Sequence, residues 1–119
     1  MLYVDVWHWL DENGNVPREH PQLRPRVLRL ARFIEYAADL SAGQARSTLV
    51  ECKKRPGRHQ CDGQMVVIKM KDDRILAICP VCEEEEAMIQ NWQTTPWGKG
   101  MPKAARPSTL LGGAQPDLG

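Results

Sequence analysis

The sequence predicts an α+β fold in which an N-terminal strand and one amphipathic helix precede two or three antiparallel strands. Two patterns indicate this order. Apolar residues recur at helical spacing between residues 24 and 40, and two apolar runs surround a polar turn between residues 65 and 78. Cysteines flank the second pattern, at positions 52, 61, 79 and 82. A chain of 119 residues fits one domain and is too short for two independent cores.

In the first part of the domain, residues 1–46, we expect a strand, a loop and a helix. Residues 2–10 are rich in aromatic and β-branched types, which favour a strand, and the following Asp-Glu-Asn-Gly predicts a turn. The helix should cover residues 24–40, because Pro25 suits its first turn and Gly43 lies just beyond its end.

In the second part, residues 47–97, residues 47–51 can form a short strand that leads into Cys52. The two apolar runs between residues 65 and 78 predict a β-hairpin. Residues 83–92 fit two structures: residues 87–92 suit a third strand, whereas four consecutive glutamates suit the first turn of a helix. We favour the strand. Residues 98–119, with many Gly and Pro, should form a flexible tail.

Charge is unevenly distributed along the chain, although the net charge is only +1. Residues 21–58 contain nine Lys or Arg against three acidic residues, and residues 59–90 contain seven acidic residues against three basic ones. Any electrostatic recognition must therefore be local. The N-terminus has no basic leader followed by a long apolar stretch, and nothing approaches the roughly 18 apolar residues of a membrane span. We expect a cytoplasmic protein with no membrane association.

The four cysteines predict a metal site, because thiols stay reduced in the cytoplasm and clustered thiolates there bind metal more often than they form disulfides. Cys79-Pro-Val-Cys82 has the spacing with which two thiolates bind one face of a Zn²⁺ ion. Cys52 and Cys61 are separated by eight intervening residues, and a Pro-Gly turn between them lets the chain double back. We therefore expect a C-terminal zinc ribbon with Zn²⁺ bound by four sulfurs. Such a site has no open position for water or substrate, so the zinc would be structural.

Three alternatives to this site stay open. The Cys-x-x-Cys pair can be a redox pair, although that motif usually opens a helix and here follows a predicted hairpin. The four cysteines can be unrelated buried residues, although Cys52 and Cys61 lie in a polar segment. His59 can replace Cys61 as a ligand, since it is two residues away and imidazole binds zinc well.

Three segments resemble a group of small, uncharacterised bacterial zinc-ribbon proteins. They are the basic Pro-Gly loop between Cys52 and Cys61, the Cys-Pro-x-Cys knuckle at residues 79–82, and an Ile-x-x-Trp-x-x-Thr-x-Trp ending at residues 89–97. The resemblance covers residues 50–98 and implies a ribbon with four cysteine ligands. It implies no activity, because none is assigned to the group. The glutamates at residues 83–86 replace the Gly-containing turn expected after the knuckle.

Two groups of cations are the predicted contacts to nucleic acid. One is a helix stripe at i, i+3 and i+6, and the other is the loop beside the cysteines; the residues are Arg26, Arg29, Arg32, Lys53, Lys54, Arg55 and Arg58. Both can bind phosphates. Alternatively, the stripe is an ordinary solvated helix face, and the loop cations offset the negative charge of a four-thiolate zinc site.

Four tryptophans, Trp7, Trp9, Trp92 and Trp97, support an alternative function, because exposed indoles can anchor a protein partner. Such an adaptor or inhibitor could also use the acidic patch at Glu83–Glu86. At least two tryptophans should instead pack in the core, and Trp7 and Trp9 should share one face of the first strand. No nucleophile, base or open metal position can be assembled from the sequence, so we expect a protein that is not an enzyme.

Overall fold

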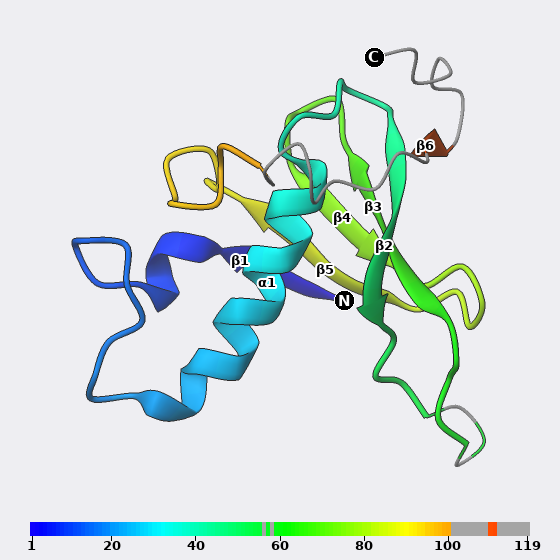
Figure 1. Cartoon of the computed structure of the whole chain (residues 1–119), viewed down its shortest axis with the longest axis horizontal. Helices are drawn as coiled ribbons and strands as arrows, with labels where there is room; N and C mark the ends of the chain where they lie inside the picture. Colours follow the sequence, from blue (N-terminus) through cyan, green and yellow to red (C-terminus); the bar gives the residue numbers. More distant parts are fainter. Residues whose placement is uncertain (56, 58, 101–109, 112–119) are drawn as a thin grey trace.

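The computed structural model describes residues 1–55, 57, 59–100 and 110–111. One α-helix, α1 (Arg24–Ala37), lies across one face of a mixed sheet (Figure 1). The strands are β1 (Leu2–Asp5), β2 (Ala45–Glu51), β3 (Gln64–Lys69), β4 (Ile75–Ile78), β5 (Glu85–Gln90) and β6 (Leu110–Leu111). Their order across the sheet is β1-β5-β4-β3-β2-β6, and only β1 and β5 are parallel. The predicted α+β class is confirmed.

The strands expected to form a separate ribbon are instead the central strands of this wider sheet. The hairpin is confirmed, since β3 and β4 pair antiparallel around a turn in which Met70 and Arg74 are hydrogen-bonded. Residues 83–92 contain a strand, β5, as we favoured. However, β2 extends the hairpin on one side and β1 joins β5 on the other. The prediction of two or three antiparallel strands therefore underestimates the number of strands in the sheet.

The first strand is shorter than predicted. β1 ends at Asp5, whose carboxylate accepts a hydrogen bond from the Trp7 N–H at 3.1 Å. This side chain caps a 3₁₀ helix at Val6–Trp9, so the expectation that Trp7 and Trp9 share a strand face is wrong. The predicted turn follows, with the Asp11 carboxylate accepting hydrogen bonds from the N–H groups of Asn13 and Asn15.

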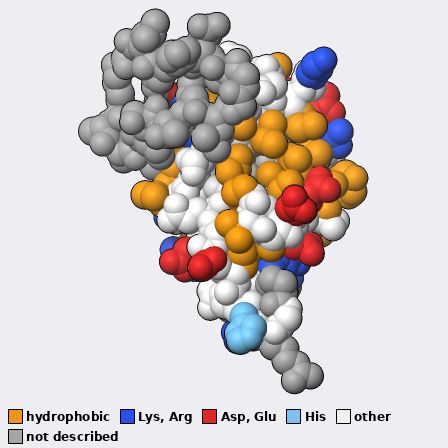
Figure 2. Space-filling model, turned by 90° about the vertical axis from the view of Figure 1, so that its right-hand side faces the viewer, with side chains coloured by type: hydrophobic (Ala, Val, Ile, Leu, Met, Phe, Trp, Pro, Cys, Tyr) orange, Lys and Arg blue, Asp and Glu red, His pale blue; other side chains and the backbone are white. Residues whose placement is uncertain are grey.

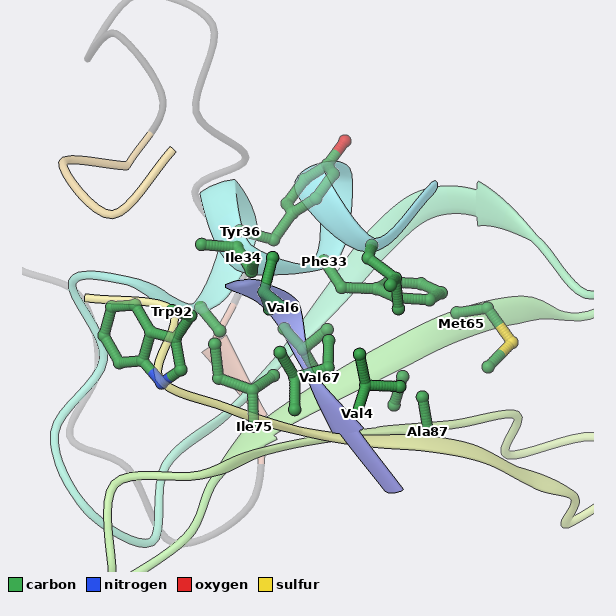
Figure 3. Packing of buried hydrophobic residues seen from close by; sticks show 14 of the residues in the cluster. Val4, Val6, Phe33, Ile34, Tyr36, Met65, Val67, Ile75, Ala87 and Trp92 are labelled. Carbon is green, nitrogen blue, oxygen red and sulfur yellow. The ribbon is translucent and has the colours of Figure 1, made fainter. Parts of the chain in front are cut away.

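The core lies between α1 and the sheet. Phe33 and Ile34 of α1 face Val67 and Ile75 of the sheet, and all four are fully buried (Figure 3). Strands β3 and β4 point alternate side chains toward the helix, as the pleat requires. Helix α1 stops three residues before the predicted end. Beyond it, the buried Lys69 ammonium group donates hydrogen bonds to the carbonyl groups of Ala38 and Leu40.

The opposite face of the sheet carries a continuous apolar row. Strand pairing places Tyr3, Met88, Leu76, Ile68 and Ala45 side by side across five strands. These residues alternate with those that point toward α1. Figure 2 shows a side of the molecule on which hydrophobic side chains gather, with acidic side chains beside them. The single α-helix among the described residues lies on the other face of the sheet.

Most of the predicted tail, residues 101–109 and 112–119, lies outside the described residues. Leu110 and Leu111 pair with Arg46 and Ala45 as β6. Trp97, where we expected the folded part to end, packs half-buried against the core. Among the described residues, no helix combines the length and the apolar character needed to cross a bilayer.

Candidate metal centre

Four cysteine sulfur atoms lie together at one end of the sheet. The Sγ atoms of Cys52 and Cys82 are 3.7 Å apart, those of Cys61 and Cys79 are 3.6 Å apart, and all four lie within 4.8 Å of one another. A tetrahedral ion with Zn–S bonds of about 2.3 Å requires sulfur atoms about 3.8 Å apart. The cluster therefore has the dimensions of a four-thiolate metal site.

Two chain reversals bring these sulfurs together, and both lie at the same end of the sheet (Figure 1). The first continues the β2–β3 hairpin: the Cys52 N–H donates to the Gly63 carbonyl at 3.0 Å, and the Cys61 N–H donates to the Lys54 carbonyl at 2.9 Å. The second joins β4 to β5, with the Cys79 N–H donating to the Glu84 carbonyl at 3.0 Å. Each reversal supplies two ligands, so the long spacing between Cys52 and Cys61 is closed by ordinary hairpin pairing.

Backbone N–H groups point at the sulfur atoms. The Lys54 N–H lies 3.4 Å from the Cys52 Sγ, and the Gly63 N–H lies 3.4 Å from the Cys61 Sγ. Donors at this position favour the negatively charged thiolate and orient it as a ligand.

The thiols differ in their readiness to ionise in the absence of metal. Burial raises the pKa of Cys52 to about 12. Burial also opposes ionisation of Cys79, but the N–H groups of Cys82 and Val81 outweigh it and lower the pKa of Cys79 to about 7. For Cys61 the Gly63 N–H favours the thiolate, yet burial and the neighbouring thiols together raise the pKa. A metal ion is the group that would hold all four as thiolates, since ligation requires deprotonated sulfur.

Gly63 is needed at this site because there is no room for a side chain. A Cβ atom at position 63 would lie 2.7 Å from the Cys79 Sγ and 2.8 Å from a methyl carbon of Val81. The close approach lets the two reversals meet at the cysteines. The glycine two residues after Cys61 is the sequence signal for this close approach, and the spacing of the cysteines alone does not reveal it.

The turn after Cys82 has the backbone of a glycine turn although it contains glutamate. Glu83 has a φ of 62°, in the left-handed region that glycine enters most readily. Its N–H donates to the Cys79 carbonyl at 2.8 Å and closes the knuckle. At the position where the resemblance implies a Gly-containing turn, Glu83 therefore adopts the left-handed backbone that glycine favours.

The site is largely closed to solvent. Cys52, Cys61 and Cys79 are buried, and Cys82 is half-buried. The described residues that can together hold a metal are these four cysteines; His59 is exposed and is not among them. Such a set of four soft ligands suits Zn²⁺.

The predicted basic stripe on α1 is not one free surface. Both oxygen atoms of Glu86 accept hydrogen bonds from Arg29 at 2.7 Å, so Arg29 links α1 to β5. Arg26 and Arg32 are both exposed, and the guanidinium of Arg32 lies 5.8 Å from the centre of the Tyr36 ring. The charge of Arg29 is therefore paired with Glu86, which leaves the phosphate contacts predicted for the stripe a proposal.

In the loop between Cys52 and Cys61, Lys53, Lys54 and Arg55 are exposed, and Arg58 lies outside the described residues. The structure brings the first two of these close to Arg26 around one cavity. That proximity joins the two basic segments that the sequence presented separately. Trp9 also lines this cavity, a placement that strand periodicity did not predict.

Comparisons with protein-family models, with curated proteins and with solved structures find no match. The geometry of the site is therefore the basis for assigning a function.

Proposed function

We propose that this protein is a non-enzymatic binding module in which a structural Zn²⁺ ion, held by four cysteines, fixes a basic surface that contacts nucleic acid. One observation carries the proposal. The backbone of Lys54 is held on both sides by the metal centre, since its N–H points at the Cys52 Sγ and its carbonyl accepts from the Cys61 N–H. Closure of the metal site therefore holds the loop backbone at Lys54, from which the neighbouring cations project.

A basic loop held in this way should bind phosphate groups better than an unstructured basic loop would. Lys53, Lys54 and Arg55 are exposed, and no ion pair is found for them among the described residues. Cations held in a fixed arrangement lose less conformational freedom when they bind an anion. Their role in offsetting the charge of the thiolates is compatible with this function, because the same side chains can face solvent beyond the metal.

The test has two parts, performed on the full chain purified under reducing conditions. Elemental analysis should find one zinc ion per chain. Binding to a labelled nucleic acid should then weaken steeply with salt, since each phosphate contact releases counterions. The double variant Lys54→Glu and Arg55→Glu should bind weakly at low salt and show a flatter salt dependence.

Lys71→Glu is the matched control, because Lys71 is exposed in the β3–β4 turn and lines neither the loop nor the cavity beside it. It should bind nucleic acid much like the parent. A folded protein without stoichiometric metal would rule out the structural zinc. A zinc-loaded parent that binds no nucleic acid at low salt would rule out the basic surface as a nucleic-acid contact.

A protein partner is the second candidate, and the sheet favours it more than the tryptophans do. Trp92 is buried and the other three tryptophans are half-buried, while Glu86 of the acidic patch is paired with Arg29. In contrast, Tyr3 at the β1 end of the apolar row is 68% exposed, whereas Met88, Leu76 and Ala45 in the same row are buried. A second copy of the chain could contact the row at this exposed end. Sedimentation of the purified parent and of Tyr3→Glu tests this: self-association that the variant loses supports it.

A further inference from the structure

The described part of the chain contains a cavity in which the two basic segments meet an apolar floor. Its volume is about 470 Å³. It lies between the start of α1, the strands β1 and β5, and the loop that follows Cys52. The residues that line it are Leu2, Trp9, Pro25, Arg26, Arg29, Leu30, Lys53, Lys54, Glu86 and Ala87.

We propose that this cavity receives one unpaired base of a single-stranded nucleic acid, with its flanking phosphates bound by Arg26, Lys53 and Lys54. The inference rests on the proposed function and names the form of nucleic acid that the same basic surface binds. It also gives Trp9 a role that the basic surface alone does not require.

The excess of cations at the rim of the cavity favours the binding of an anion. Four cations line it against one carboxylate, that of Glu86, and both oxygens of that carboxylate are occupied by Arg29. Arg29 itself is 12% exposed and is committed to this pair. The exposed cations Arg26, Lys53 and Lys54 remain for phosphate groups, and they come from two different segments, so they can bind on two sides of one nucleotide.

The apolar residues on the floor of the cavity favour the binding of a flat apolar group. Leu30 and Ala87 are buried, Trp9 is half-buried, and Pro25 and Leu2 add further apolar surface. A simple phosphate or sulfate ion would leave this surface in contact with water. A base stacks on aromatic side chains, and each stacked base typically adds about 1 to 3 kcal/mol to binding, roughly a 5- to 150-fold gain.

A cavity that combines cations with an apolar floor should also bind single strands in preference to duplexes. In a duplex the faces of the bases are covered by their neighbours, so the floor would gain no contact. In a single strand the base can turn out of the chain while its phosphates remain on the rim. The volume lies within the range of about 300 to 1,000 Å³ that is usual for small-molecule sites, and is enough to enclose a compact ligand group.

The experiment uses the full, zinc-loaded chain labelled with 5-fluorotryptophan, which gives one fluorine resonance for each tryptophan. The resonance of Trp9 is assigned with Trp9→Phe. Addition of an oligothymidylate of about ten nucleotides should shift the Trp9 resonance and leave that of Trp97 in place. Trp97 is the matched reference, because it is also half-buried but does not line the cavity.

Affinity measurements complete the test. Trp9→Leu keeps an apolar side chain at this position and removes the aromatic face, so it should weaken binding of the oligothymidylate by about 5- to 150-fold. Trp97→Leu should leave binding unchanged. A duplex of the same length should bind more weakly than the single strand, and thymidine monophosphate should shift the Trp9 resonance only at high concentration, since it offers a single phosphate.

The outcomes distinguish this inference from the proposed function. If the oligothymidylate binds in a salt-dependent way but the Trp9 resonance does not move, or if the duplex binds equally well, the basic surface stands and the base site is overturned. If nothing binds at low salt, both fail. Should Trp9→Leu lose zinc or fail to fold, the fluorine shift in the chain with all four tryptophans decides the matter.

Discussion

Gly63 shows how much of the metal centre depends on single residues that are not ligands. The missing side chain lets Cys79 and Val81 approach the end of the β2–β3 hairpin, and the Gly63 N–H points at the Cys61 Sγ. One residue therefore joins the two halves of the site. Most substitutions at position 63 would keep the backbone N–H, whereas any side chain would fill the space that Cys79 and Val81 occupy.

We expect Gly63→Ala to weaken zinc binding by about 10- to 100-fold, the usual effect of disturbing a group that supports metal ligands. The added methyl group would lie 2.7 Å from the Cys79 Sγ, so one of the reversals must shift. Competition with a chromophoric chelator measures the affinity. Gln64→Ala, an exposed neighbour, should bind zinc as the parent does. Equal affinities for the parent and Gly63→Ala would contradict the close approach.

The thiols make zinc binding dependent on pH. The raised pKa values of Cys52 and Cys61 mean that both carry protons at pH 7 in the metal-free site, and ligation must release them. Zinc affinity should therefore fall as the pH is lowered, by about 100-fold or more per unit near pH 7. Calorimetry in buffers of different ionisation enthalpy counts the released protons. Fewer than two protons would show that these thiols are already ionised.

At the scale of secondary-structure elements, α1 is tied to the sheet by buried or half-buried charges as well as by apolar packing. Arg29 links α1 to β5 through Glu86. At the other end, Lys69 of β3 places its ammonium group below the carbonyls that follow α1, where the helix dipole favours a cation. The ammonium also lies 4.4 Å from the centre of the Trp92 ring. Lys69 therefore stabilises the chain just beyond the C-terminal end of α1.

Lys69→Met should destabilise the protein by about 2 to 4 kcal/mol, because the carbonyls of Ala38 and Leu40 would lose their donor. Methionine keeps most of the volume of the lysine stem, so the loss reports the ammonium group. Urea denaturation of the zinc-loaded protein measures it. Lys71→Met, on the exposed turn that follows, should change stability by less than about 0.5 kcal/mol. Equal stabilities would mean that water replaces the ammonium group.

For the whole molecule, the metal centre and the core are continuous. Cys52, Cys61 and Cys79 belong to the same buried cluster as the residues that α1 packs against. Beyond the pairing of β3 with β4, the two reversals meet at the cysteines and at Gly63. A small core gains much of its stability from such a crosslink.

Removal of zinc by a chelator should therefore loosen the ends of the β2–β3 and β4–β5 hairpins first, because the energy of metal binding is also folding energy. Hydrogen exchange followed by mass spectrometry should show lost protection in residues 52–63 and 79–85. Cys79→Ser should reproduce the pattern without chelator. If protection and thermal unfolding are unchanged after zinc is removed, the metal is dispensable for the fold.

The sequence by itself determined the features that depend on neighbours along the chain. Helical spacing located α1, two apolar runs located the hairpin, and the spacing of four cysteines located the metal centre. These patterns are local because a helix repeats every 3.6 residues, a strand every two, and a hairpin folds back on itself.

Only the tertiary structure decided which distant residues meet. The parallel pairing of β1 with β5 joins residues separated by most of the folded chain, and no local period indicates such a contact. The same is true of Glu86, which pairs with Arg29, and of Trp9, which lies in one cavity with Lys53 and Arg26. Side-chain types are visible in the sequence, but their partners depend on how the sheet and helix pack, and that packing determines which cations are free to bind.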